Sequence, residues 1–355
     1  MISGLRSQFF KTLNAKLNIE DTSGLYSYLL ERGVIQKNTK VNFTLLSGGV
    51  SNRTVLLEFD NGSSWVMKQA LEKLRVDGDW FCSPERIFYE AEAMRWLDRY
   101  VPGNTPKLVF EDRSEYILAM EAVQRPFENL KTLLINNPPK SKYFISAGKL
   151  LGQIHLQGLK EENCIPELFN DVRFFHSLRI EPYYLETIKQ VEDTGGFYKT
   201  LIDDTNKDRF TIVHGDYSPK NLLVKNGKLI LLDHEVTHFG DGTFDLGFFM
   251  AHLLSKANHL PDHRREFLIG TTQFFQAYNV VINGLNKSRE HRAVRHTIGC
   301  LLARVCGLSP LEYLSQGQRR TQKALALQLM KDIPRSVDKM VSKFKDLIDA
   351  GNKKN

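Results

Sequence analysis

A short polar stretch between two apolar runs carries residues suited to phosphoryl transfer. Asp216 precedes Asn221 by five residues, and Asp233 follows the apolar run 229–232. Transfer of a phosphoryl group to a hydroxyl needs a carboxylate that orients the hydroxyl and accepts its proton, and it needs oxygen ligands that hold Mg²⁺. The stretch therefore offers Asp216 as the base, with Asn221 and Asp233 as metal ligands.

A second carboxylate and a lysine extend this set. Glu235 lies two residues after Asp233, so in an extended segment it would face the same side and add a metal ligand. Phosphates also need a cation, and Lys68 lies on a predicted strand that follows a hairpin. Such a lysine needs an acidic partner on the next helix, where Glu90 and Glu92 are the candidates.

Turn signals and periodicity divide the chain into a β-rich first part and a helical second part. Asn61-Gly62 predicts a hairpin, and Ile87, Ala91, Met94 and Leu97 have helical spacing. The helical part is interrupted once, by short strands that flank the polar stretch. This order predicts an α+β protein with a boundary near residues 124–126. We expect an N-terminal lobe of residues 1–123 that binds nucleotide and a C-terminal lobe of residues 124–355 that binds substrate.

The polar stretch resembles the signature of the aminoglycoside phosphotransferase and choline kinase superfamily. The sequence reads HGDYSPKN at 214–221, LLDHE at 231–235 and FDLG at 244–247. The resemblance implies a protein-kinase-like fold of two lobes with ATP in the cleft, and a kinase that phosphorylates a hydroxyl of a small molecule with ATP and Mg²⁺. It also implies that Asp245 braces the catalytic loop, and it favours Glu90 as the partner of Lys68.

The same resemblance implies where the nucleotide binds in the first lobe. A flexible loop over the phosphates corresponds to the turn-forming stretch that includes Ser47, Gly48 and Gly49. A hinge that receives adenine through backbone groups corresponds to Met120, Glu121, Ala122 and Val123.

Two segments of the first lobe are similar to methylthioribose kinases. These are VMKQALEKLR at 66–75 and FYEAEAMRWL at 88–97. Arg304 resembles the second of two adjacent arginines in the substrate site of those enzymes, which implies a substrate contact. The chain departs from their pattern in two places, because Ala303 replaces the first arginine and Asn221 ends the catalytic loop. A sugar or thiosugar acceptor is therefore one expectation, and an aminoglycoside or choline acceptor is the alternative.

Composition limits the remaining classes of protein. The 355 residues contain no uninterrupted apolar run of eighteen, so we expect no membrane-spanning helix. The four cysteines include no CxxC, which favours reduced thiols and a cytoplasmic location. The net charge of +7 is concentrated after residue 286, where a basic helix face explains it without nucleic acid. We expect a small-molecule substrate, no nucleic-acid or membrane partner, and a homodimer as a candidate assembly. A nucleotide-binding pseudokinase and a nucleic-acid binder are the competing functions.

Overall fold

The computed structural model describes residues 17–47, 49–76, 79–160 and 165–352. The chain forms two compact units. The first exchange point from unit 1 to unit 2 lies within helix α3 (Arg86–Tyr100) and the second lies at Gln124–Arg125, with a return to unit 1 at Pro106–Lys107 between them. Unit 1 comprises the described residues up to Ala91, together with Lys107–Gln124. Unit 2 comprises Glu92–Pro106 and the described residues from Arg125 onward. The predicted lobe boundary falls beside the second exchange point, whereas the predicted lobe of residues 1–123 includes the segment Glu92–Pro106 that packs with unit 2.

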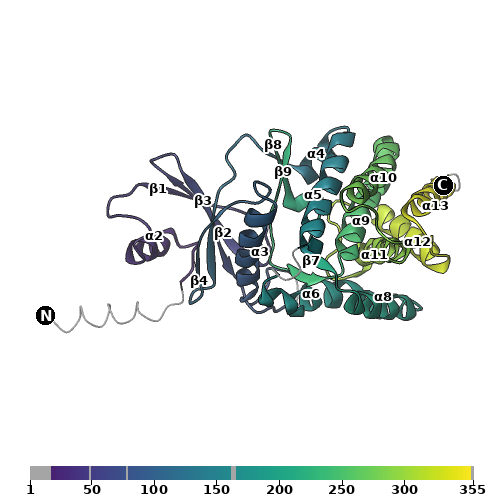
Figure 1. The fold of residues 1–355 in the computed structure, drawn as a ribbon, viewed down its shortest axis with the longest axis horizontal. Helices are drawn as coiled ribbons and strands as arrows, with labels where there is room; N and C mark the ends of the chain where they lie inside the picture. The colour runs from purple at the N-terminus through teal and green to yellow at the C-terminus, as the bar shows by residue number, and fades with distance from the viewer. Residues whose placement is uncertain (1–16, 48, 77–78, 161–164, 353–355) are drawn as a thin grey trace. The chain divides into compact units, whose positions relative to one another are not determined.

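Unit 1 is built on an antiparallel sheet with the strand order β1-β2-β3-β5-β4 (Figure 1). Asn61-Gly62 joins β2 to β3, and Gly62 takes a positive φ of 82°, as the hairpin turn requires. The strands are β1 (Val41–Leu45), β2 (Asn52–Phe59), β3 (Ser64–Ala70), β4 (Leu108–Asp112) and β5 (Ile117–Glu121).

The two faces of this sheet have different roles. Val55, Met67 and Ala119 are buried cross-strand neighbours, and they form one core with Leu25 and Leu29 of helix α2 (Thr22–Glu31). Because successive side chains of a strand point to opposite faces, Lys68 lies on the face away from α2. That face carries the polar chemistry of unit 1.

Unit 2 contains the short strands around the polar stretch. β7 (Thr211–Val213) pairs with β10 (His238–Gly240), and β8 (Leu222–Lys225) pairs with β9 (Lys228–Leu231) and β6 (Glu128–Asn129). The helix-like segment η5 (Pro219–Asn221) lies between β7 and β8. Asn226-Gly227 forms the turn of the β8–β9 hairpin, and both residues have positive φ.

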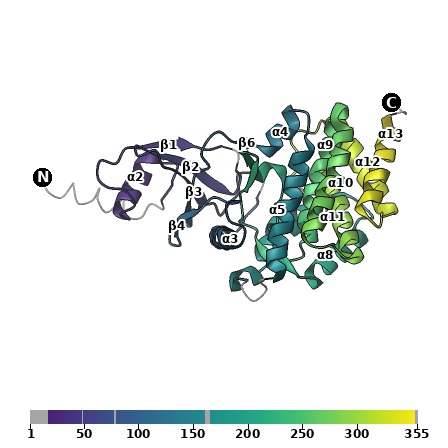
Figure 2. The ribbon, with the colours of Figure 1, turned by 45° about the horizontal axis from the view of Figure 1, so that its top comes forward.

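Helices form the rest of unit 2. Figure 2 shows α5 alongside α10, and α9 alongside α11, and these pairs pack against each other. The helical segments are α4 (Leu130–Asn136), α5 (Ser141–Lys160), η3 (Glu167–Asn170), α6 (Arg173–Phe175), η4 (His176–Leu185), α7 (Glu186–Gln190), α8 (Gly195–Lys207), α9 (Thr243–His259), η6 (Pro261–His263), α10 (Arg264–Val281), α11 (Lys287–Cys306), α12 (Gln316–Lys331) and α13 (Val337–Asn352).

The α+β fold class is confirmed, with a β-rich first unit and a helical second unit. Within the described ranges, no helix is both long enough and apolar enough to cross a bilayer.

Close contact between α5 and α10 depends on a glycine. A Cβ atom at Gly148 would lie 2.1 Å from the carbonyl oxygen of Phe274, which cannot move without shifting α10. Gly148→Ala should therefore lower the free energy of unfolding by about 2 kcal/mol, because overpacking outweighs the gain in helix propensity. Urea unfolding measures this change. Gly196→Ala in α8 is the control, since its Cβ would meet open space. Equal stability of the two variants would contradict the packing argument.

Candidate active site

The predicted catalytic loop follows β7 and turns sharply at Gly215. Its φ of 74° is unfavourable for other residues, and an added Cβ would lie 2.7 Å from Cγ1 of Val236. Glycine thus lets the loop pass close to the 236–237 segment. The turn brings Asp216 to a position where its side chain is only 4% exposed.

Asp245, near the start of α9, holds this loop through hydrogen bonds from the loop's backbone. One carboxylate oxygen accepts a hydrogen bond from the backbone N–H of His214 (2.7 Å), and the other accepts from Gly215 N–H (2.8 Å). His155 of α5 lies 3.4 Å from the same carboxylate. The predicted bracing role of Asp245 is confirmed by these contacts.

His214 also braces the loop. Its Nδ1 accepts from the backbone N–H of Asp216 (3.1 Å), so the proton is on Nε2, which donates to the carbonyl of Leu232 (3.1 Å). Burial lowers the pKa of His214 and keeps the ring neutral, despite nearby carboxylates such as Asp245 and Asp216. This ring therefore links the catalytic loop to the segment that carries Asp233.

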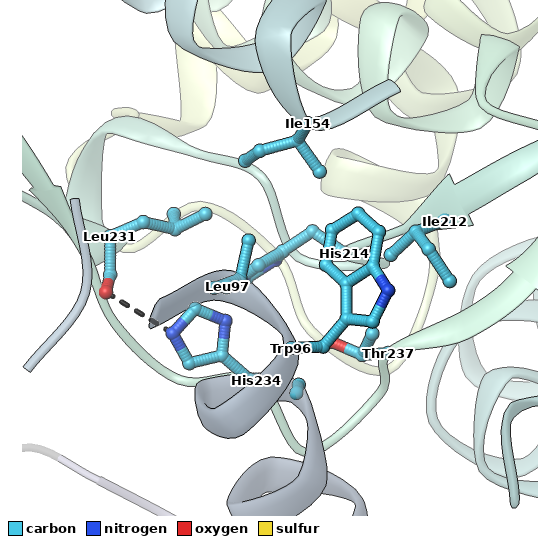
Figure 3. A pocket seen from close by; sticks show the side chains of 9 residues that line it. Trp96, Leu97, Ile154, Ile212, His214, Leu231, His234 and Thr237 are labelled. Carbon is cyan, nitrogen blue, oxygen red and sulfur yellow. Dashed lines mark hydrogen bonds between the residues drawn. The ribbon is translucent and has the colours of Figure 1, made fainter. Parts of the chain in front are cut away.

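Behind the loop lies a small cavity in unit 2. Figure 3 shows His214 and His234 around it, with Trp96 and Leu97 from α3. The cavity has a volume of about 10 Å³. That is room for about one water molecule, whereas ligand pockets have volumes of roughly 300–1,000 Å³. His214 thus faces packed structure and not a substrate-sized space.

Three polar side chains hold one oxygen of Asp216. Its Oδ2 accepts from Nδ2 of Asn221 (2.8 Å) and forms ion pairs with Lys220 (3.0 Å) and Arg179 (3.2 Å). Its Oδ1 is buried and makes no hydrogen bond to any of the described residues. The carboxylate is therefore oriented through one oxygen, while the other can accept a proton from a ligand.

The cations beside Asp216 decide its charge. Burial acts to raise the pKa of Asp216, but Arg179 and Lys220 outweigh it and hold the pKa below its usual value. Asp216 in turn raises the pKa of Lys220, and it raises that of Arg179 against the opposing effect of burial. The loop therefore holds an ionised carboxylate, which is the form a proton acceptor needs.

Asn221 and Asp233 supply oxygen atoms suited to Mg²⁺. The amide nitrogen of Asn221 donates to Asp216, which leaves the amide oxygen as the group that can bind a cation. Asp233 follows β9, as predicted, and is close enough to raise the pKa of Asp216. Its φ of 69° is a strained conformation of the kind found at functional sites. Mg²⁺ is usually held by one or two carboxylates together with phosphates and water, so these residues fit it.

The expectation of an extended segment at Glu235 is wrong. Residues 235–236 form a turn, so strand alternation does not place Glu235 beside Asp233. Glu235 is buried and acts electrostatically on Arg179 together with Asp233. Its role as a metal ligand stays a prediction. Within the described ranges, no group of three or more His, Cys, Asp or Glu side chains is placed to hold a metal ion.

The predicted ion pair of unit 1 is present. Nζ of Lys68 on β3 lies 2.7 Å from Oε1 of Glu90 on α3, and the two side chains are 13% and 1% exposed. Glu92, the alternative, pairs with Arg95. The pair fixes the lysine on the face of the sheet opposite α2, and its contact with phosphate stays a prediction.

The predicted phosphate loop is anchored at its far end. Ser47 and Gly49 are exposed, and Gly48 lies outside the described residues. The guanidinium of Arg86 donates to the carbonyl of Ser51 and to the carbonyl of Leu71 (2.7 Å). The loop thus exposes Ser47 and Gly49, while its C-terminal end at Ser51 is held by Arg86.

The predicted hinge residues follow or end β5. Glu121 N–H donates to the carbonyl of Lys107 (2.8 Å), and Ala122 N–H donates to that of Ser64 (2.9 Å). Met120 is buried in the sheet. Adenine binding here would therefore have to use carbonyl groups or the N–H of Val123.

Arg304 lies near the end of α11 and is 9% exposed. It donates to the hydroxyl of Tyr183 (3.1 Å) and to the hydroxyl and carbonyl of Ser309. Within the described part of the chain, Arg304 forms no ion pair with a carboxylate. A salt bridge between C-terminal helices therefore does not account for this buried arginine. Its contact with substrate stays a prediction.

Sequence reasoning missed the cations that hold Asp216. Lys220 lies inside the motif, four residues after Asp216, and that spacing could have indicated an ion pair. Arg179 lies in η4, distant in sequence, and no local signal marks it. Arg86 was also missed, because its partners are backbone carbonyls, which no sequence pattern reveals.

Comparison with known proteins shows to which family the chain belongs. A family model described as "Phosphotransferase enzyme family" matches residues 42–274, which is more than half of the sequence. The chain belongs to this family. The match covers the ion pair of unit 1 as well as Asp216, Asn221 and Asp233. The resemblance drawn from the motifs is thereby confirmed.

Curated relatives include methylthioribose kinases, as the first-lobe segments predicted. The chain is 23% identical over 272 residues to "Methylthioribose kinase" of Geobacillus sp. (strain WCH70), covering 66% of this chain and 65% of that protein. The match thus spans slightly less than two-thirds of that relative. A similar protein of Bacillus thuringiensis subsp. konkukian (strain 97-27) is 24% identical over 274 residues, covering 68% of this chain and 67% of the relative.

Solved structures agree on the fold. Choline kinase from Cryptosporidium parvum Iowa II has a TM-score of 0.56 at 12% identity, covering 93% of this chain and 97% of the other. Amicoumacin kinase hAmiN, solved with AMP-PNP, Ca²⁺ and Ami, has a TM-score of 0.55 at 14% identity, covering 87% and 94%. These likenesses confirm the protein-kinase-like fold.

The bracing by Asp245 can be tested through stability. Asp245→Asn keeps one oxygen but turns an amide nitrogen toward a backbone N–H donor, so the free energy of unfolding should fall by about 2–3 kcal/mol. Asp203→Asn, at an exposed position of α8, is the control and should change little. Urea unfolding compares the two. A stability of Asp245→Asn equal to that of the control would show that the loop does not depend on this carboxylate.

Proposed function

We propose that this phosphotransferase-family protein is an ATP-dependent kinase that transfers the γ-phosphoryl group to a hydroxyl of a small molecule. The observation that carries the proposal is the state of Asp216. It is an ionised, buried carboxylate with one oxygen held by cations and the other left without a hydrogen-bond partner among the described residues. A general base in phosphoryl transfer needs this arrangement.

In the proposed reaction, Asp216 orients the acceptor hydroxyl and takes its proton on Oδ1. The acceptor oxygen bonds to the γ-phosphorus, the bond from that phosphorus to the bridging oxygen breaks, and ADP leaves. Arg179 and Lys220 keep Asp216 ionised until the proton arrives. The bracing by Asp245 and His214 keeps the carboxylate from turning away.

Asn221 and Asp233 would hold Mg²⁺, with Glu235 as a further candidate. The cation, when bound, neutralises charge on the phosphates. Amicoumacin kinase was solved with a nucleotide analogue and Ca²⁺, which supports a divalent cation with the nucleotide here. In unit 1, the ammonium of Lys68, held by Glu90, would bind phosphate oxygens, and the loop with Ser47 and Gly49 would contribute backbone N–H groups.

The acceptor proposed is a sugar or thiosugar. The named relatives are methylthioribose kinases, and Arg304 supplies a buried donor without a carboxylate partner in the described residues. Aminoglycoside and choline acceptors are cations, for which acidic or aromatic groups would be expected. A pseudokinase role has less support, because the positions that catalysis needs hold suitable residues.

Replacing the proposed base should separate chemistry from binding. Asp216→Asn keeps the shape but cannot take the proton, so turnover should fall by about 10³ or more while nucleotide affinity changes little. Phosphorylation of an acceptor panel and calorimetry with Mg·AMP-PNP measure the two properties. Turnover within about threefold of the wild type would exclude Asp216 as the base.

Replacing the proposed metal ligand Asp233 should weaken the binding of the nucleotide with its metal. Asp233→Asn removes the charge but keeps a residue type that tolerates a positive φ, so affinity for Mg·AMP-PNP should fall at least tenfold. Asp193→Asn is the matched control, because Asp193 also has a positive φ, of 63°, on an exposed turn. Unchanged Mg·AMP-PNP affinity in the Asp233 variant would rule out this ligand.

A further inference from the structure

Lys256 is a buried cation that the proposed reaction does not use. It lies in the last turns of α9 and is 1% exposed. In the described part of the chain no carboxylate lies within ion-pair distance of its ammonium group. Its ammonium donates a long hydrogen bond, of 3.5 Å, to the carbonyl oxygen of His252 in the preceding turn. A buried charge with so little compensation is costly, and such groups are normally paired.

Further polar groups with unused atoms surround Lys256. The ring of Tyr313 lies 5.2 Å from its ammonium, and the hydroxyl of that tyrosine is buried. Burial lowers the pKa of His252, and the charges of Arg304 and Lys256 lower it further, so both cations lie near this ring. The Tyr313 hydroxyl, Nε of Arg304 and Nε2 of His252 have no hydrogen-bond partners among the described residues. Several buried polar atoms of this region are thus available to a ligand.

The charges of this region do not balance. Lys131 pairs with Glu312, and Lys220 pairs with Asp216. Arg304 and Lys256 are left without a carboxylate in the described residues. Burial, followed by the charge of Lys131, lowers the pKa of Lys256 to about 7, and the opposing charge of Glu312 does not outweigh them. An anion bound here would restore the balance and keep the ammonium charged.

Contacts with the ring of Tyr183 connect this region to the proposed base. Arg179, which pairs with Asp216, lies over the ring of Tyr183 at 5.7 Å. Arg304 lies over the same ring at 5.5 Å and donates to its hydroxyl. The region also reaches the surface, because the side chains of Lys131 and Glu312 are 33% and 65% exposed.

We propose that Lys256, together with Arg304 and Tyr313, binds an oxyanion, either a carboxylate or a phosphate, carried by the molecule whose hydroxyl is phosphorylated. The assignment to the acceptor rests on the proposed kinase function, whereas the anion site itself does not. Among the sugars and thiosugars proposed as acceptors, the site then favours those that carry an anionic group, such as a sugar acid or a sugar phosphate.

Anion-dependent thermal stability tests the site directly. The full-length wild type, Lys256→Met and Lys142→Met are titrated with potassium phosphate and with potassium acetate, each against KCl at equal ionic strength. The titrations are run with and without Mg·AMP-PNP. Lys142 is the matched control, because its ammonium also lies over a tyrosine ring, 5.1 Å from that of Tyr143, but on the surface of α5.

At least one oxyanion should raise Tm of the wild type and of Lys142→Met above the KCl value. In Lys256→Met the apparent affinity for that oxyanion should be at least about tenfold weaker. Whether phosphate or acetate acts distinguishes the two chemical sources. No stabilisation beyond KCl in the wild type, or equal stabilisation of Lys256→Met, would overturn the proposal.

Two further measurements keep the test decisive. If Lys256→Met does not fold, the wild-type titration still decides, and a crystal grown in the active oxyanion should place it within hydrogen-bond distance of Nζ of Lys256. An anion elsewhere would reject the site. If the protein turns over ATP normally but binds no anion, only this inference is wrong. If it binds the anion but phosphorylates no acceptor, only the proposed function is wrong.

Discussion

One buried carboxylate determines how the centre of unit 2 is built. Asp216 is 4% exposed, and burial alone would favour its neutral form. Arg179 and Lys220 reverse that preference, and Asn221 donates a hydrogen bond to the same oxygen. Because a buried ion is costly without such partners, the ionised form of Asp216 depends on these three side chains. The result is a carboxylate whose charge is fixed by the fold.

The loop around Asp216 is held by long-range contacts within unit 2. Asp245 connects it to α9, and His155 connects that carboxylate to α5. His214 joins the loop to Leu232, next to Asp233. The helical core therefore sets the position of both the proposed base and the proposed metal ligand. Asp245 and His214 act through hydrogen bonds to backbone groups. Such bonds fix the path of the loop as well as the orientation of a side chain.

Local patterns were sufficient to predict the elements and the motif residues. Asn61-Gly62 predicted the hairpin between β2 and β3, where Gly62 takes a positive φ, and thereby placed Lys68 on the strand that follows. The role of Asp245 followed from the resemblance. Glu235 was misplaced because a turn at residues 235–236 replaces the extended segment assumed. The roles of Arg179 and Lys256 could not be predicted from the sequence. Helix packing brings Arg179 to its carboxylate partner and buries Lys256 without one among the described residues.

The central claim is that Asp216, Asn221 and Asp233 serve one nucleotide-bound metal and one acceptor hydroxyl. A crystal structure with AMP-PNP and Mn²⁺ in place of Mg²⁺ tests it most directly, because anomalous scattering locates the metal. The account predicts Mn²⁺ within coordination distance of Oδ1 of Asn221 and of a carboxylate oxygen of Asp233. It also predicts that Oδ1 of Asp216 faces the γ-phosphate without a protein partner. A metal held by other residues, or Oδ1 of Asp216 bonded to a protein donor, would contradict the account.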